Sequence, residues 1–219
     1  MQCKGFLFDL DGTLVDSLPT SEKIWREWAH EHKVSSDDVL GYIHGRQAIS
    51  SLRHFLHDQT EDVIQNEWLE LEKRECNNTA DIIALPGVHS FLQFLEDNNI
   101  PWAIVTSGTP KLARVRHAAA KLPMPKVFIT AEQIKNSKPH PEPFLLGAQE
   151  LGLSPSDCIV VEDAIAGIQS GLAAGCKVIA VNAPSEVNEI EHIDLVISSL
   201  ESISFQSIAE GIVKIQIKL

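Results

Sequence analysis

A chain of 219 residues forms one domain or two and is long enough to bury a sizeable core. Its composition, 44% hydrophobic and 22% charged, is ordinary for a globular protein, and its net charge of -12 argues against non-specific binding to nucleic acid or to an anionic membrane. No apolar stretch approaches the roughly 20 residues of a membrane-spanning helix, and the first apolar segment runs straight into charged residues, unlike a signal peptide.

The first predicted element is an apolar strand over residues 4–8, which ends in Asp9-Leu10-Asp11-Gly12-Thr13. Side chains on a strand repeat every two residues, so Asp9 and Asp11 leave its end on one side. Two carboxylates this close repel each other unless a cation or a shared proton is present. A divalent metal with a nucleophile and a proton donor is one solution, and an Asp-Gly turn that merely ends the strand is the alternative.

Residues from about 17 to 84 carry helical patterns only. The predicted helices are 18–32, 36–42, 47–56 and 61–75. Trp25 and Trp28 lie three residues apart, a spacing typical of core packing on one helix face. A helical block inserted after the first strand predicts a small cap domain over 17–84, with a discontinuous core domain over 1–16 and 85–219.

Beyond residue 85, strands and helices alternate. Short apolar segments without strict alternation predict buried parallel strands at 102–106, 127–130, 158–162 and 178–181. Helical patterns lie between most of them, at 86–98, 110–122, 142–151 and 164–174. This order predicts an α/β fold with a doubly wound, Rossmann-like parallel sheet. Residues 194–198 form a further predicted strand, and the alternation over 212–219 suits an exposed edge strand.

Polar side chains follow three of these strands. In open α/β sheets ligands bind at the carboxyl ends of the strands, where Asp9 and Asp11, Thr106-Ser107-Gly108 and Glu162-Asp163 would meet. Lys138 lies in a loop just before a helix and could join them. Each group also has a plainer interpretation: a helix N-cap for the second and third groups, and a solvated loop charge for Lys138. Those interpretations do not explain why all of them occur together.

The group suits phosphoryl transfer, which needs in-line positioning and neutralisation of oxygen charge. Asp9 would attack phosphorus and form an aspartyl-phosphate, while Asp11 would protonate the leaving oxygen and then deprotonate water. Mg²⁺ prefers oxygen ligands, which Asp9 and Asp163 would offer, with the backbone carbonyl of Asp11 and with Glu162 nearby.

The remaining groups would contact the phosphoryl oxygens. Thr106 would donate its hydroxyl to a phosphate oxygen, and Ser107 could add a contact. Lys138 would balance the charge between the phosphate and the nucleophile.

Four motifs occur in chain order and span most of the sequence. They are Asp9-Leu10-Asp11-Gly12-Thr13, Thr106-Ser107, Lys138-Pro139 and Glu162-Asp163-Ala164. The ordered set resembles the haloacid dehalogenase-like hydrolase superfamily, in particular its β-phosphoglucomutase-like group and the small enterobacterial sugar phosphatases that act on hexose and hexitol phosphates. The resemblance implies a Mg²⁺-dependent phosphomonoesterase with an aspartyl-phosphate intermediate and a helical cap.

The resemblance also assigns residues. The implied metal site comprises Asp9, Asp11, Asp163 and Glu162. The implied catalytic residues are Asp9, Asp11, Thr106 and Lys138. The implied substrate contacts are Asp9, Leu10, Asp11, His44, Gly45, Arg46, Thr106, Ser107 and Lys138.

Residues 42–47 look like the specificity loop of the cap, with Gly45 permitting a tight turn. His44 and Gln47 could contact sugar hydroxyls, and Arg46 could contact phosphate or lie in solvent. Mutases of this group carry a histidine in the first cap helix, but the stretch 16–22 contains none. The pattern therefore favours hydrolysis, with a sugar phosphomutase as the alternative enzyme.

Two other classes remain open. A phospho-accepting signalling module also combines an acidic Mg²⁺ pocket with a hydroxyl and a lysine, although its motif order differs and it lacks a cap. A dinucleotide site is suggested only by Gly167, Gly171 and Gly175, whose spacing of four fits close helix packing and a helix C-cap better.

The expected partner is a small phosphorylated sugar or sugar alcohol, with no nucleic acid and no membrane, bound by a monomer. The four cysteines form no Cys-x-x-Cys pair and predict reduced thiols in a cytoplasmic protein. The nine histidines lack zinc-site spacing.

Overall fold

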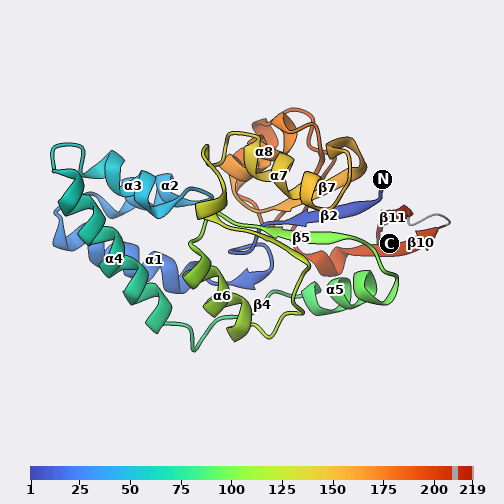
Figure 1. Cartoon of the computed structure of the whole chain (residues 1–219), viewed down its shortest axis with the longest axis horizontal. Coiled ribbons are helices and arrows are strands. Elements are labelled where there is room, and N and C mark those ends of the chain that lie inside the picture. The colour runs from blue at the N-terminus through green and yellow to red at the C-terminus, as the bar shows by residue number, and fades with distance from the viewer. Residues whose placement is uncertain (209–211, 219) are drawn as a thin grey trace.

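A parallel sheet forms the centre of the molecule in the computed structural model, which describes residues 1–208 and 212–218. Within these residues, six strands pair in the order β6-β5-β2-β7-β8-β9 (Figure 1). Their bounds are β2 Gly5–Phe8, β5 Trp102–Val105, β6 Val127–Ile129, β7 Cys158–Glu162, β8 Lys177–Val181 and β9 Leu195–Ile197. The first strand of this sheet, β2, thus lies between β5 and β7, and the strand order reverses at this point.

Helices cover both faces of this sheet, as the doubly wound prediction requires. They are α5 Val88–Asp97, α6 Pro110–Ala119, α7 Glu142–Glu150 and α8 Ile165–Ala173. Phe6 and Phe8 of β2 belong to one apolar cluster with α5, whereas Leu7 belongs to a second cluster with α7 and α8. Successive side chains point to opposite faces of a strand, so both faces of β2 are buried.

The glycines of α8 confirm helix packing rather than a dinucleotide loop. A Cβ at Gly171 would lie 3.0 Å from Cγ1 of Val160 in β7, and a Cβ at Gly167 would overlap the carboxylate of Glu162. The helix therefore lies close against β7 because both residues lack a side chain.

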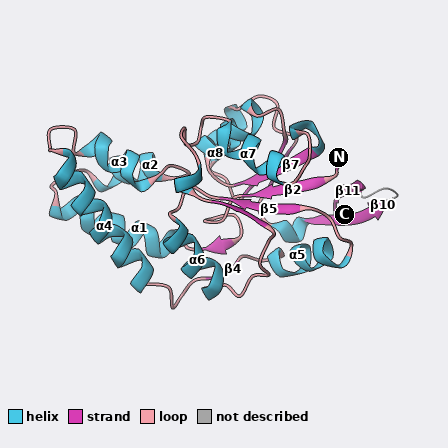
Figure 2. Cartoon of the chain, in the orientation of Figure 1, coloured by secondary structure: helices cyan, strands magenta, loops and turns pink. Residues whose placement is uncertain are grey.

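Four further helices are continuous along the chain and pack around an apolar cluster of their own. They are α1 Leu18–Glu31, α2 Ser36–Ile43, α3 Ala48–Phe55 and α4 Glu61–Asn77. Trp25 and Trp28 are both buried in this cluster, as their spacing predicted. These helices, called the helical block below, lie to one side of the sheet in Figure 2.

Two short strands join the helical block to the rest of the chain. They are β3 Val15–Asp16 and β4 Ile83–Ala84, which pair antiparallel. The chain therefore enters and leaves the block at neighbouring points. None of the described helices is long and apolar enough to cross a membrane.

The C-terminal segment corrects one prediction. The strand β11 Ile212–Ile217 is not an edge strand, because it lies between β1 Gln2–Cys3 and β10 Ile203–Ile208 in a separate antiparallel sheet. It pairs with β10, the strand just before it in the chain, and with β1 near the N-terminus, and its inner side chains Val213 and Ile215 are buried. Residue Leu219, the end of the predicted strand, lies outside the described residues.

Short 3₁₀ helices complete the described structure. They are η1 Ala131–Gln133, η2 Pro155–Asp157, η3 Ser185–Glu189 and η4 Leu200–Ser202. The predicted α-helices all form, each within three residues of its expected bounds.

Phe91 joins the two sheets, and we expect its truncation to destabilise the fold. Its ring packs against Phe6, Phe8 and Phe205, at centroid distances of 5.1, 5.5 and 4.8 Å. Phe91→Ala leaves a cavity at this junction and should lower the free energy of unfolding by about 3–5 kcal/mol. Urea denaturation measures the change. Leu145→Ala, at an exposed position of α7, is the control and should shift it by less than about 0.5 kcal/mol.

Candidate active site

The polar residues that follow the central strands meet at one edge of the sheet. Asp9 follows β2, Thr106 follows β5, and Glu162 and Asp163 lie at the end of β7. Since β2 pairs with both β5 and β7, these side chains are neighbours in space. All four are buried, as is Lys138, which comes from the loop between η1 and α7.

Lys138 is enclosed by hydrogen-bond acceptors. Its Nζ donates to Asp9 Oδ1 at 2.6 Å, to Glu162 Oε1 at 2.6 Å and to the Val105 carbonyl at 3.0 Å. Burial disfavours the charge of this lysine, but Asp9 and Glu162 outweigh burial and hold its pKa above the ordinary value. Lys138 is therefore a fixed cation inside the site and not a solvated loop charge.

Three carboxylates surround that cation on one side. Asp9, Glu162 and Asp163 each place one oxygen within 4.8 Å of the others. Burial raises the pKa of Asp9 to about 7 although Lys138 opposes it. Burial, followed by the charges of Glu162 and Asp9, raises the pKa of Asp163. Carboxylates that resist ionising together form an environment that can hold a divalent cation.

The carboxylates are not equally available to a metal. Glu162 accepts from Lys138 at one oxygen and from the Ala164 N–H, at 2.8 Å, at the other. Asp163 accepts from the Thr13 hydroxyl at 2.9 Å through Oδ1. The second oxygens of Asp9 and Asp163 accept no hydrogen bond from the described residues, which leaves them open for a cation.

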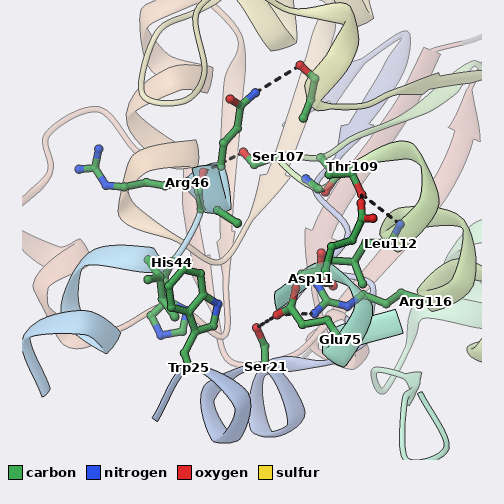
Figure 3. A pocket seen from close by; sticks show the side chains of 18 of the residues that line it. Asp11, Ser21, Trp25, His44, Arg46, Glu75, Ser107, Thr109, Leu112 and Arg116 are labelled. Carbon is green, nitrogen blue, oxygen red and sulfur yellow. Dashed lines mark hydrogen bonds and ion pairs between the residues drawn. The ribbon is translucent and has the colours of Figure 1, made fainter. Parts of the chain in front are cut away.

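Asp11 is held from a different side, by residues that the sequence analysis did not identify. Its Oδ1 accepts from the Ser17 hydroxyl at 2.6 Å and pairs with Arg116 Nη1 at 2.9 Å. Arg116 also pairs with Glu75 Oε1 at 3.2 Å, and Ser21 donates to the same oxygen at 2.7 Å. Figure 3 shows Asp11, Arg116, Glu75 and Ser21 close together beside the cavity.

One sequence signal could have identified Arg116. The buried residues of α6 are Leu112, Ala113, Arg116 and His117. Their spacing defines the inner face of an amphipathic helix, and an arginine on such a face needs a buried anionic partner.

Thr106 and Ser107 have different environments. Thr106 Oγ1 accepts from the Gly108 N–H at 3.0 Å, which leaves its own hydroxyl proton free to donate. The N-cap of α6 is Thr109, whose side chain accepts from the Leu112 N–H, so Thr106 and Ser107 do not cap that helix. Ser107 donates to the Gly45 carbonyl at 2.9 Å and thereby contacts the helical block.

The loop between α2 and α3 lies over the strand ends and lines the cavity with His44, Gly45, Arg46 and Gln47. Gly45 has φ of +73°, which a side chain rarely adopts, so the predicted tight turn does form. His44 Nε2 lies 3.4 Å from Glu22 Oε1, and Gln47 donates to the Ala131 carbonyl at 3.3 Å.

The Arg46 guanidinium lies 4.6 Å from the centre of the Tyr42 ring and points away from Asp11 (Figure 3). The Leu10 side chain is buried in the core, so only its backbone can face a substrate.

The cavity between the strand ends and the helical block has a volume of about 130 Å³. From the core it is lined by Asp9, Asp11, Thr106, Ser107 and Asp163, and from the block by Trp25, Trp68, Glu72 and Glu75 among others. A phosphate ester can therefore place its phosphoryl group at the strand ends and its remaining part against the helices.

Comparison with known proteins agrees with this geometry. The family model of the haloacid dehalogenase-like hydrolases matches residues 3–175. The chain is 55% identical to hexitol phosphatase A of Escherichia coli over 216 residues, which cover 99% of this chain and 100% of that protein. It is 33% identical to glycerol-1-phosphate phosphohydrolase 1 of Saccharomyces cerevisiae over 90% of this chain and 82% of that one.

A solved structure has a similar fold. The crystal structure of β-phosphoglucomutase from Clostridium difficile superposes with a TM-score of 0.81, at 26% identity, over 90% of this chain and 92% of that one. The four motifs, the doubly wound sheet and these similarities together show that the chain is an enzyme of the haloacid dehalogenase-like hydrolase family.

Proposed function

We propose that this enzyme is a Mg²⁺-dependent phosphatase of small sugar phosphates, with hexose and hexitol phosphates as substrates. One observation carries the proposal: Asp9 lies next to the fixed charge of Lys138 and to Asp163, at the strand end that opens into the cavity. The 55% identity to a hexitol phosphatase over nearly the whole chain supports the substrate class.

Residues 17–84 act as the cap domain of this enzyme, and residues 1–16 and 85–219 as its catalytic core. Support for this division comes from the separate apolar cluster of the helical block and from the paired strands β3 and β4 through which the chain crosses. Because the cavity lies between the two parts, movement of the cap would admit substrate and then exclude water.

Asp9 is the nucleophile and becomes an aspartyl-phosphate as the sugar leaves. Lys138 stabilises the ionised form of Asp9 and the negative charge that spreads over the phosphoryl oxygens. Thr106 donates its free hydroxyl proton to one of those oxygens. Asp11 gives a proton to the leaving oxygen and takes one from the water that hydrolyses the intermediate.

The open carboxylate oxygens of Asp9 and Asp163, with the backbone carbonyl of Asp11, would hold Mg²⁺. When bound, the ion supplies positive charge to the phosphoryl oxygens. Glu162 serves mainly to hold Lys138, since both of its oxygens already accept hydrogen bonds. We therefore propose Asp9, Asp11 and Asp163 as the metal ligands, without the Glu162 that the motifs also suggested.

The mutase alternative finds less support. Mutases of this group use a cap arginine to hold a second phosphate, but Arg46, which could serve this role, stacks on Tyr42 away from Asp11. The monomeric state, the lack of nucleic-acid and membrane partners and the cytoplasmic location stay predictions of the sequence.

Phosphate release from a panel of esters tests the function. The panel comprises hexose 6-phosphates, hexitol phosphates, glycerol phosphate, β-glucose 1-phosphate and a nucleotide. We expect Mg²⁺-dependent release that chelation with EDTA removes and added Mg²⁺ restores. Asp9→Asn should lower release by more than about 10³-fold, because the amide is not a nucleophile.

Other outcomes of the same assay would assign another class. Conversion of β-glucose 1-phosphate to the 6-phosphate without free phosphate would make the enzyme a mutase. Stable labelling of Asp9 without turnover would make it a signalling module.

His44 tests the role of the loop over the cavity. We expect His44→Ala to raise KM for hexitol phosphates about tenfold, since a lost hydrogen bond to a sugar hydroxyl weakens binding by roughly 1.5 kcal/mol. KM for 4-nitrophenyl phosphate, whose ring has no such hydroxyls, should change much less. An equal loss on both substrates would contradict a role of this loop in specificity.

A further inference from the structure

Arg116 is buried between two carboxylates that belong to different parts of the enzyme. It comes from α6 of the core, and its guanidinium pairs with Asp11, which follows β2, and with Glu75, near the end of α4 in the helical block. Arg116 and Glu75 are both buried, with exposed fractions of 5% and 4%. A buried guanidinium with two anionic partners has a fixed position and direction.

Two serines complete a ring around this arginine. Ser17 immediately precedes α1 and donates to Asp11, and Ser21 one turn later donates to Glu75. Residues four apart lie on the same face of a helix, so one face of α1 supports both carboxylates. Figure 3 shows Asp11, Arg116, Glu75 and Ser21 close together, where the core meets the helical block.

Stabilisation of the folded state alone does not explain this arrangement. The Arg116–Glu75 pair is buried on both sides, and such pairs gain little net free energy because removing the charges from water offsets their attraction. Arg116 Nε is, moreover, a buried donor without a hydrogen-bond partner among the described residues, and such a donor destabilises the folded state. Unsatisfied buried groups of this kind call for an explanation other than packing.

We propose that Arg116 is a positioning residue, which fixes the carboxylate of Asp11 for proton transfer and links its position to the cap through Glu75. The proposal rests on the proposed function, in which Asp11 handles the proton of the leaving oxygen. A proton donor must lie within hydrogen-bond reach of that oxygen. The residues that contact the donor determine whether it is held in that position. Any displacement of α4 moves Glu75, and Arg116 transmits that movement to Asp11.

Two substrates with different leaving groups distinguish this role of Arg116 from a merely structural one. The alkoxide of a hexitol needs a proton as it departs, whereas 4-nitrophenolate is stable enough to leave without one. The ratio kcat/KM covers the steps up to departure of the leaving group, so it isolates this proton transfer. We expect Arg116→Met to lower kcat/KM for sorbitol 6-phosphate about 10²–10³-fold and for 4-nitrophenyl phosphate less than about tenfold.

A matched control lies on the same two helices. Lys111 of α6 pairs with Glu72 of α4 at 3.3 Å and also joins core and block, but neither residue contacts Asp11. Lys111→Met should change kcat/KM less than about threefold for both substrates, because Lys111 is exposed, does not line the cavity and makes no ion pair with Asp11.

Glu75→Gln keeps the side-chain shape and removes the charge that holds Arg116 on the cap side. It should lower kcat/KM for sorbitol 6-phosphate about tenfold and leave the aryl ester within about threefold.

Several results would overturn the proposal. Equal losses on the two substrates in folded Arg116→Met, or no loss on either, would show that Arg116 does not act through proton transfer. If circular dichroism shows that Arg116→Met is unfolded, the substrate ratio of Glu75→Gln decides, and an unchanged ratio refutes the link. If the unmodified enzyme releases phosphate from neither ester, the proposed function itself fails, and this inference with it.

Discussion

Three buried carboxylates meet at the carboxyl end of the parallel sheet, and Lys138 supplies the positive charge beside them. Without that charge, Asp9 and Glu162 would repel each other in an environment that already disfavours ionisation. Lys138 also bonds the Val105 carbonyl, so one side chain ties together the ends of the three central strands β2, β5 and β7. The geometry of the site therefore depends on this ammonium group and on the close packing of α8 that keeps Glu162 in place.

Much of the fold could be predicted because it is encoded locally. Residues 5–8 and 158–161 are short apolar runs typical of buried strands, and the predicted helices carry their own amphipathic spacing. The C-terminal strand was placed wrongly because its position depends on partners about 200 residues away at β1, which no local pattern reveals. The strand β10 was not predicted either, because its place depends on the packing of Phe205 against Phe91 of α5, more than 100 residues earlier in the chain.

In the candidate site, too, some residues could be predicted from local sequence and others could not. Residues that directly follow strands, such as Asp9, Thr106 and Asp163, could be placed because the sheet itself fixes where its strands end. The helix pattern could have marked Arg116 as buried, but not its partners, because its pairing with Glu75 depends on how a core helix packs against the helical block. Ser107 lies between these cases: its position was predicted, but its hydroxyl contacts the Gly45 carbonyl of the loop over the cavity.

The adjacent strands β3 and β4 give the enzyme a modular construction, because a whole helical block can be exchanged there without interrupting the sheet. Arg116 limits that freedom. A block taken from another protein would leave the guanidinium with one anionic partner fewer unless it offered a carboxylate where Glu75 lies. Chimaeras that recombine helical blocks and sheets must therefore preserve this electrostatic match across the junction, and natural diversification of the block is subject to the same constraint.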